Sequence, residues 1–309
     1  MSVERSIILV TGGAGFIGSH VTRGLLAEGH RAVVVDNLAT GYAENVPPGA
    51  EFIEADISQA SVCESLPGDV DMVLHLAAQS SGPKSADIPA QDFDCNVRGT
   101  FNMLQYCRYH GIRRFVHASS MSVYGNPDLD VVNETTPAVP LSYYGVSKLC
   151  AEKYVQHAIL DGLEATIFRM FSVYGPGQDL SNRMQGMLSI FLSFITAGED
   201  VVVMGSAERV RDFVYIDDVV AAWLDAVHAP GGTGVHNLGT GTATTVADLV
   251  AALVAATGNA PDYPVRYEAA TPADQLGFVA DTTGIRQALG WAPTVDLQTG
   301  IEQFVDSLE

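Results

Sequence analysis

The chain has 309 residues, which is enough for one large α/β domain with an appended lobe. Its 47% hydrophobic residues and 30 glycines are typical of a compact enzyme and exclude a disordered or fibrous chain. The formal net charge is -20 and lysine occurs only at positions 84, 148 and 153, so no nucleic-acid partner is expected.

The spacing of the cysteines and the hydropathy of the chain indicate the cellular compartment. Cys63, Cys95, Cys107 and Cys150 are widely spaced, with no C-x-x-C pair and no histidine in ligand register. Neither a metal site nor a disulfide framework is therefore expected. The chain starts with a strand-like run instead of a signal peptide, and no apolar run reaches about 18 residues. We expect a cytoplasmic protein without a membrane partner.

The first elements in chain order are a strand, a glycine loop, a helix and a second strand. The apolar run 6–10 leads into residues 11–18, where glycines recur as G-x-x-G-x-x-G. A helical pattern follows to about residue 28, and the apolar run 32–35 ends at an acid, Asp36. This order of elements is typical of a dinucleotide-binding unit.

Each glycine in this loop has a physical purpose. Gly12 permits the tight turn, Gly15 lets backbone N–H groups approach a pyrophosphate, and Gly18 allows close helix–strand packing. Asp36 would accept hydrogen bonds from an adenosine ribose and would repel a 2′-phosphate, which favours NAD over NADP. Asp56, after the strand 51–54, could reach the adenine, or could serve only in strand-end packing.

Strands and helices continue to alternate along the next hundred residues. Strands are predicted over 70–75, 114–118 and 165–168, and helices over 97–109 and 144–158. This alternation predicts a Rossmann-type, doubly wound parallel sheet, with ligands beyond the carboxyl ends of its strands. The residues expected along that edge are Gly12, Asp36, Ala77, Ser119-Ser120 and Arg169-Met170.

The pattern changes beyond residue 170. A polar loop opens at Pro176, a helix is predicted over 187–197, and short strands alternate with helices. We expect residues 1–171 to form an NAD-binding domain and residues 172–309 a smaller α/β substrate-binding lobe. Within the lobe, residues 214–227 are expected to return to the main sheet as a strand and a helix, so that segments near 212–230 belong with it.

Tyr144 and Lys148 lie four residues apart and face the same side if this stretch is helical. A tyrosine has a pKa of about 10, so acting as a base near neutrality requires roughly 4 kcal/mol of preference for the phenolate. A positive charge about 4 Å away supplies about that much at an effective dielectric constant near 20. The pair alone is also common on solvated helices, so its role depends on the surrounding chain.

The whole chain resembles the extended short-chain dehydrogenase/reductase family, specifically its nucleotide-sugar epimerases and dehydratases. The match rests on several motifs in the family's order. They are the glycine loop Thr11 to Gly18, His75-Leu76-Ala77-Ala78, Asn96, Ser119 to Gly125, Tyr144 to Lys148, Tyr174-Gly175-Pro176, and Arg211 to Val219.

The resemblance implies roles for individual residues. Tyr144 would be the acid/base, Lys148 would hold the nicotinamide ribose and lower the tyrosine's pKa, and Ser120 would hydrogen-bond the same sugar hydroxyl. Asn96 would order the lysine through water. The expected cofactor residues are Gly12, Gly15, Phe16, Ile17, Gly18, Asp36, Asn37, Asp56, Ile57, Leu76, Ala77, Ala78, Asn96, Ser119, Tyr144 and Lys148. The expected substrate residues are Ser120, Ser122, Tyr144, Ser172, Arg211, Asp274 and Phe278.

The segment after Ser120 selects among the family's reactions. Dehydratases of the family follow this position with Asp-Glu, whereas this chain has Met121-Ser122. A thioether donates no proton and serine is a poor base, so dehydration is disfavoured. No additional arginine for a decarboxylase's carboxylate pocket is evident. The resemblance therefore implies NAD-dependent 4-epimerisation of a nucleotide-diphosphate hexose, of the UDP-glucose/UDP-galactose type, through a transient 4-keto sugar.

Departures from the family pattern keep the substrate open. Ser172 stands where UDP-galactose-type epimerases have asparagine, so UDP-glucuronate is an alternative. Thr271 replaces an arginine, which would omit a phosphate contact or shift it to Arg183 or Arg209. Phe278 lies where the family has a gatekeeper against 2-acetamido groups, or is simply a core residue.

Two further alternatives concern the class of protein and its assembly. An NAD-sensing binding protein with this fold would commonly lack Tyr144 or Lys148, and both are present here. Relatives pair the two helices predicted at 97–109 and 144–158 across a subunit interface, which implies a homodimer. Phe101, Leu104, Cys150 and Tyr154 are the candidate interface residues.

Overall fold

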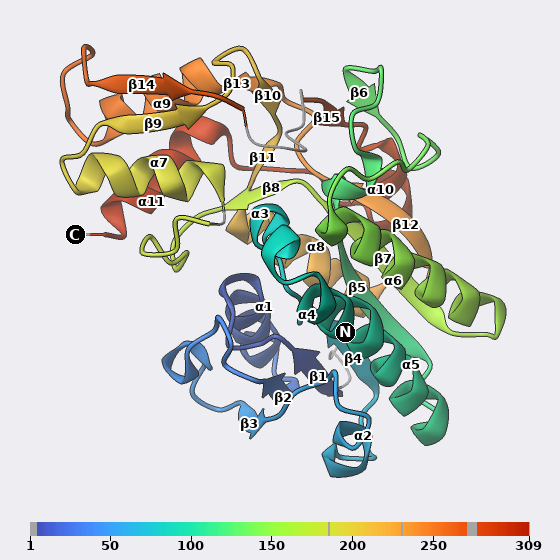
Figure 1. Cartoon of the computed structure of the whole chain (residues 1–309). Coiled ribbons are helices and arrows are strands. Elements are labelled where there is room, and N and C mark those ends of the chain that lie inside the picture. Colours follow the sequence, from blue (N-terminus) through green and yellow to red (C-terminus); the bar gives the residue numbers. More distant parts are fainter. Residues whose placement is uncertain (1–4, 185, 230, 271–276, 309) are drawn as a thin grey trace.

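A seven-stranded parallel sheet forms the centre of the protein. The computed structural model describes residues 5–184, 186–229, 231–270 and 277–308. The strand order is β12-β7-β5-β4-β1-β2-β3, so the chain winds outward in both directions from β1 (Figure 1). The strands are β1 (Ile7–Thr11), β2 (Arg31–Asp36), β3 (Glu51–Glu54), β4 (Met72–His75), β5 (Arg114–Ser120), β7 (Glu164–Met170) and β12 (Gly234–Leu238).

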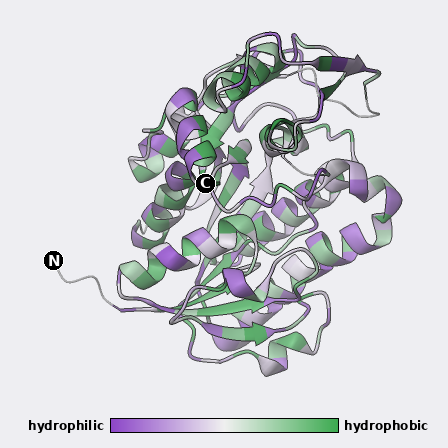
Figure 2. Ribbon diagram, turned by 90° about the vertical axis from the view of Figure 1, so that its left-hand side faces the viewer, coloured by the Kyte–Doolittle hydropathy of each residue, from purple (hydrophilic) through white to green (hydrophobic). Residues whose placement is uncertain are grey.

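Both faces of this sheet are buried under helices, which explains why its strands are almost continuously apolar. Successive residues of a strand point to opposite faces, so Ile8 packs with α1, α8 and α10, while Leu9 packs with α2, α5 and α6. Figure 2 shows the hydrophobic strands enclosed between helices with polar outer surfaces. These helices are α1 (Phe16–Ala27), α2 (Val62–Ser65), α5 (Gly99–His110), α6 (Tyr143–Leu160), α8 (Ile216–His228) and α10 (Thr283–Leu289).

Short helical segments connect the strands on the ligand-facing side of the sheet. Three of them lie between β4 and α5 in the order α3, α4 and a π-helical turn, and this turn runs directly into α5. The segments are η1 (Ala43–Asn45), α3 (Gly82–Asp87), α4 (Pro89–Phe93), the π-helical turn η2 (Asp94–Arg98) and η3 (Met121–Tyr124).

A smaller lobe lies beyond the carboxyl ends of the main strands (Figure 1). It has its own core, in which apolar residues of three helices meet short strands. The helices are α7 (Met187–Thr196), α9 (Val246–Ala256) and α11 (Leu297–Asp306). The paired strands outside the main sheet are β9 (Val201–Met204) with β14 (Val265–Glu268), β10 (Val210–Arg211) with β13 (Thr244–Thr245), β8 (Ser172–Tyr174) with β11 (Phe213–Tyr215), and β6 (Val131–Val132) with β15 (Val279–Ala280).

The segment expected to return to the main sheet does so only as a helix. α8 packs on the sheet through Val219, Ala222 and Trp223. The strand before it, β11, pairs instead with β8, and the main sheet takes its edge strand from β12. The strand part of that prediction is therefore wrong: β8 follows directly on β7 and offers β11 a partner before the sheet edge is reached.

Within the four described ranges, none of the helices combines the length and the apolar character that crossing a bilayer requires.

Candidate active site

The start of helix α6 positions Tyr144. The Ser142 hydroxyl caps the helix by accepting from the backbone N–H of Gly145 at 3.1 Å, so the helix begins at Tyr143. A side chain at Gly145 would approach the backbone oxygen of Ser122 to 2.7 Å. Only glycine allows this contact, which brings the first turn of α6 against the segment that contains Ser120.

Ser120 ends strand β5 beside the phenol of Tyr144. A side-chain hydrogen bond with Ser120 lowers the pKa of Tyr144 and so favours the phenolate. The Ser120 hydroxyl accepts from the backbone N–H of Ser122 at 3.2 Å, which fixes its position. Ser120 and Tyr144 are thus neighbours in the chain without ligands, and the contact of Ser120 with a sugar hydroxyl stays a prediction.

Lys148 lies one helical turn further along α6 and is buried. Its ammonium nitrogen donates to the carbonyl oxygen of Ala118 at 3.0 Å and lies 5.9 Å from the centre of the Tyr144 ring. Burial raises the pKa of Tyr144 to about 12, an effect that the Ser120 hydrogen bond opposes and Asp92 reinforces. Lys148 is not among the causes of this shift in the chain without ligands, so the lowering of the tyrosine's pKa that the resemblance implies stays a prediction for the loaded site.

A cavity of about 1080 Å³ opens at the carboxyl ends of the strands and includes Tyr144 and Lys148. All the residues predicted to bind the cofactor line it, apart from Asn96. Gly12 has a φ of +74°, and a side chain there would come within 2.6 Å of the Ala77 nitrogen. The glycine loop therefore meets the end of β4 only because this residue is glycine.

The cavity fits the dinucleotide that the sequence predicts. The Asp36 carboxylate at the end of β2 accepts from the backbone N–H groups of Ala14 at 3.1 Å and Leu38 at 2.9 Å, which holds it at the cavity wall. The glycine loop opens helix α1, whose N-terminus favours an anion. Asp56 also lines the cavity, where its carboxylate accepts from the Ser58 backbone N–H at 2.9 Å.

Asn96 lies behind the cavity wall. Its side-chain oxygen accepts from the Gln79 backbone N–H at 2.8 Å, and its amide nitrogen donates to the Ser147 hydroxyl at 2.9 Å. The same nitrogen lies 3.2 Å from the buried Asp92 carboxylate. This residue thus links the segment after β4 to helix α6, and any effect on a ligand passes through its neighbours.

Most of the predicted substrate residues lie outside the wall of this cavity. The described lining residues include Tyr144 but not Ser120, Ser122, Ser172, Arg211 or Phe278. Asp274 and Thr271 are outside the described residues.

Phe278 is a core residue. Its side chain is 1% exposed, and its ring packs edge-on against Tyr124 and Phe171 at centroid distances of 5.8 and 6.0 Å. This placement favours the core interpretation of Phe278 over the gatekeeper interpretation.

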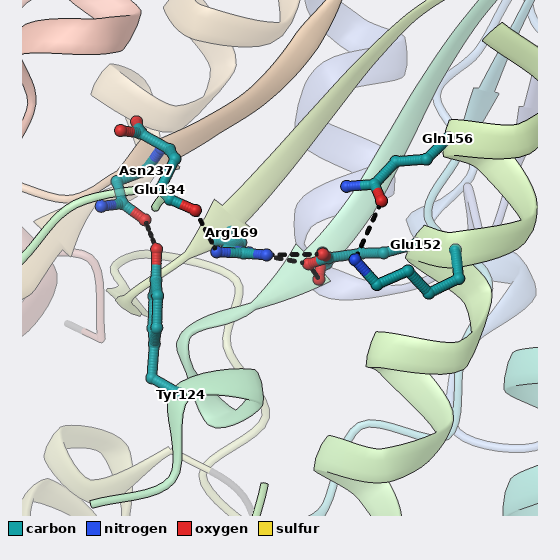
Figure 3. Close-up of polar contacts among 8 residues, drawn as sticks. Tyr124, Glu134, Glu152, Gln156, Arg169 and Asn237 are labelled. Atoms are coloured by element: carbon teal, nitrogen blue, oxygen red, sulfur yellow. Dashed lines mark hydrogen bonds and ion pairs between the residues drawn. The ribbon is translucent and has the colours of Figure 1, made fainter. Parts of the chain in front are cut away.

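A buried ion pair that the sequence did not reveal fixes the catalytic helix to the sheet (Figure 3). Glu152, one turn after Lys148, accepts from the Arg169 guanidinium at 2.8 and 3.0 Å and from the Ser119 hydroxyl. The guanidinium also donates to the Glu134 carbonyl at 3.2 Å and lies 4.8 Å from the Tyr124 ring centre. Helix α6 is thereby fixed to β5 and β7 directly below the site.

The loop after β8 contacts both sides of the cavity mouth. The Tyr42 hydroxyl donates to Asp179 at 3.0 Å, and the Ser81 hydroxyl donates to the Met184 carbonyl at 2.8 Å. All four residues line the cavity. The sequence gives no local signal for these contacts, since Tyr42 and Asp179 are 137 residues apart.

Comparison with known proteins identifies the family. Residues 8–239 match the model of the NAD dependent epimerase/dehydratase family. The chain belongs to the NAD-dependent epimerase/dehydratase family. Over 306 residues it is 37% identical to the UDP-glucose 4-epimerase of Mycolicibacterium smegmatis, covering 96% of this chain and 97% of the relative.

Solved structures agree with this family assignment. A UDP-glucose 4-epimerase from Thermotoga maritima with UDP-glucose has a TM-score of 0.91 and 35% identity, and 98% of each chain is covered. The Thermus thermophilus UDP-glucose 4-epimerase in complex with NAD also has a TM-score of 0.91 and 35% identity, covering 97% of this chain and 98% of that one. The protein is thus an NAD-dependent enzyme with the fold of these epimerases.

The family's R-D-F segment has a clear structural purpose in this member. Asp212 is fully buried and accepts from the backbone N–H groups of Thr240 at 2.7 Å, Gly241 at 2.9 Å and Ala280 at 3.0 Å. Its neighbour Arg211 is also buried and donates to the Val210 carbonyl at 2.8 Å. The segment therefore joins β10 to the ends of β12 and β15.

Lys148 leads to a prediction about stability in this family member. Burial lowers the pKa of Lys148 from 10.5 to about 8, although Cys95, Asp92 and Glu152 oppose the shift. The folded protein thus loses this proton more easily than the unfolded chain, and below pH 8 the buried ammonium destabilises the fold. Lys148→Met is expected to stabilise the ligand-free protein at pH 7 by about 1–3 kcal/mol.

Urea unfolding of both proteins at pH 7 and pH 10 measures this effect. Wild-type stability should rise relative to the variant between pH 8 and 10.5, because deprotonation removes the cost of burying the ammonium. A variant that is less stable than wild type at pH 7 would show that the Ala118 hydrogen bond outweighs the cost of desolvation.

Proposed function

We propose that the protein is a nucleotide-sugar 4-epimerase that interconverts UDP-glucose and UDP-galactose. One observation carries the proposal: Tyr144 and Ser120 form a hydrogen-bonded pair beside a dinucleotide-sized cavity, and Met121 and Ser122 follow Ser120 in the chain. The pair can move a proton at one sugar hydroxyl, while a dehydratase needs a further acid and base. The relatives named UDP-glucose 4-epimerase support the same reaction.

The residues of this chain would carry the proton chemistry. Tyr144 would take a proton from the 4-hydroxyl of the sugar and return it after the sugar has turned. Ser120 would hold that hydroxyl, and Lys148 would keep its charge next to the site through its bond to Ala118. When bound between the glycine loop and Lys148, NAD supplies the acceptor and donor of hydride and, when oxidised, a positive charge.

The raised pKa of Tyr144 has a functional consequence. With a pKa of about 12, the tyrosine is protonated at pH 7 in the ligand-free protein and is a poor base. It would become a base only when an additional positive charge enters the cavity. Tyr144 would thus not act as a base until oxidised NAD is bound in the cavity.

Incubation of the purified protein with UDP-glucose, followed by NMR, tests the proposal. The expected product is UDP-galactose with no net consumption of NAD. Accumulation of a 4-keto-6-deoxy sugar would instead establish a dehydratase. A parallel incubation with UDP-glucuronate tests the alternative raised by Ser172, which is half-buried in β8 and does not line the cavity. Binding of NAD without conversion of any sugar would favour the sensor.

The proposal also assigns the two ligands to two parts of the chain and the protein to a cellular compartment. Residues 1–171 would bind NAD and residues 172–309 would bind the nucleotide sugar. From the second part, β12 adds the edge strand of the main sheet and α8 packs on its face. A cytoplasmic location is supported by the four cysteines, all of which are free thiols.

A homodimer through α5 and α6 is part of the same proposal. Helices α5 and α6 pack against each other. The exposed rings of Phe101 on α5 and Tyr154 on α6 meet edge to face at 5.7 Å. Val146 and the half-buried Cys150 continue the patch along α6, whereas Leu104 packs on its own sheet and is removed from the candidates. Sedimentation at micromolar concentration should show a dimer, and Tyr154→Arg should shift it toward monomer.

A further inference from the structure

The cavity is lined by a lysine, Lys84, whose described contacts do not involve its ammonium group. Among the described residues that line it, the lysines and arginines are Lys84 and Lys148. The ammonium of Lys148 donates to Ala118, whereas the described contacts of Lys84 involve only its backbone. Lys84 is half-buried, and lysine is the scarcest charged residue type in a chain of net charge -20.

The arginines expected to replace the contact missing at Thr271 are committed elsewhere. The Arg183 guanidinium pairs with Glu199 at 2.7 Å and stacks 4.4 Å from the Phe194 ring centre. Arg209 is buried and donates to the carbonyls of Ser206, at 3.1 Å, and Met204. Neither lines the cavity. Lys84, which lines the cavity, is therefore a better candidate for a phosphate contact than either arginine.

The backbone of Lys84 is fixed on two sides. Ser81 caps helix α3 by accepting from the Lys84 backbone N–H at 3.3 Å and also reaches the Met184 carbonyl across the mouth. Ser85 accepts from the Tyr144 backbone N–H at 3.1 Å. Lys84 thus lies between a residue that contacts the small lobe and a residue that contacts the catalytic helix.

Negative charge lines the cavity, so a positively charged side chain there would favour the binding of an anionic ligand. The cavity is also lined by Asp36, Asp56, Asp94 and Asp179, so an anionic ligand would enter a field of like charge. Each ligand of the proposed reaction carries a diphosphate, and the following step rests on that proposed function. We propose that Lys84 binds the diphosphate of a ligand in this cleft.

Calorimetric titration measures this role without requiring turnover. Lys84→Met keeps the length of the side chain and removes its charge, and Lys84→Arg restores the charge. NAD is titrated into each protein, and UDP into each NAD-loaded protein. Lys84→Met should weaken one of the two ligands by about tenfold, with a smaller dependence on salt, and Lys84→Arg should recover most of the loss.

Lys153→Met is the matched control, because Lys153 is exposed on α6 and its ammonium donates to Gln156. If Lys84→Met weakens the affinity for NAD alone, Lys84 binds the diphosphate of the dinucleotide. If it weakens the affinity for UDP alone, Lys84 binds the diphosphate of the nucleotide sugar. Affinities for both ligands within twofold of wild type would overturn the proposal. Failure of the wild-type protein to bind UDP would instead contradict the proposed function and leave the NAD titration as a valid test of Lys84.

Discussion

Replacing Tyr144 with phenylalanine is expected to lower kcat for sugar epimerisation by about 10³-fold, since positioned acid–base groups typically contribute 10²–10⁴-fold. The variant loses only the phenolic oxygen, which is the atom that Ser120 hydrogen-bonds. The ring remains at the cavity wall, so the affinity for NAD should change by less than about threefold. Initial rates by coupled assay and NAD titration by calorimetry give the two quantities.

Tyr143 offers a control within the same helical turn. Its side chain is 58% exposed and is not among the lining residues of the cavity. Tyr143→Phe removes the same atom from the adjacent position and should leave kcat within about twofold. If Tyr144→Phe retained more than a tenth of the wild-type rate, another group would have to carry the proton, and the assignment of Tyr144 would be wrong.

Glu152→Ala is expected to lower the free energy of unfolding by about 3–5 kcal/mol, because it leaves the guanidinium of Arg169 buried without its counter-charge. The two side chains are 0% and 4% exposed, so water cannot replace the lost carboxylate. The Ser119 hydroxyl also loses its acceptor. Equilibrium urea unfolding in the ligand-free protein measures the effect.

Two further variants separate the ion pair from general damage to the helix. Gln156→Ala lies one turn away on α6 and interacts only with the exposed Lys153, so a change within about 0.5 kcal/mol is expected. Removing both charges in a Glu152→Leu, Arg169→Met double variant should restore part of the stability, because no unpaired charge remains. A double variant less stable than Glu152→Ala would show that the network depends on more than charge balance.

Local sequence patterns were enough to predict the dinucleotide half of the site. The spacing of Gly12, Gly15 and Gly18, followed by Asp36, depends on chemistry within about 25 residues. The positions along the strand ends followed from one rule of parallel sheets: Gly12, Asp36, Ala77, Ser119 and Met170 line one cavity, whereas Ser120 and Arg169 do not. The helical repeat placed Tyr144 and Lys148 on one face, but their roles came from the resemblance to a known family.

Features that depend on distant parts of the chain could not be predicted in this way. The hydrogen bond from the Lys148 ammonium to the Ala118 carbonyl joins α6 to β5, and predicting it requires knowing where β5 lies relative to α6. The pairing of Arg183 with Glu199 removes a candidate phosphate ligand that looked free in the sequence. Short strands such as β11 carry too few residues to specify their partner, so pairing is decided by the assembled lobe.

The hydrogen bond between Tyr42 and Asp179 bears on how fast a bound cofactor would be released. Tyr42 belongs to the segment after β2 and Asp179 to the loop after β8, so the two halves of the molecule meet over the part of the cleft that Asp36 lines. Under the proposed function, a dinucleotide held beneath this bond would leave only when the bond opens, whereas a nucleotide sugar would exchange at the Tyr144 end. The residence time of the cofactor would then be independent of the time of one catalytic cycle, and one bound NAD would serve many successive sugars.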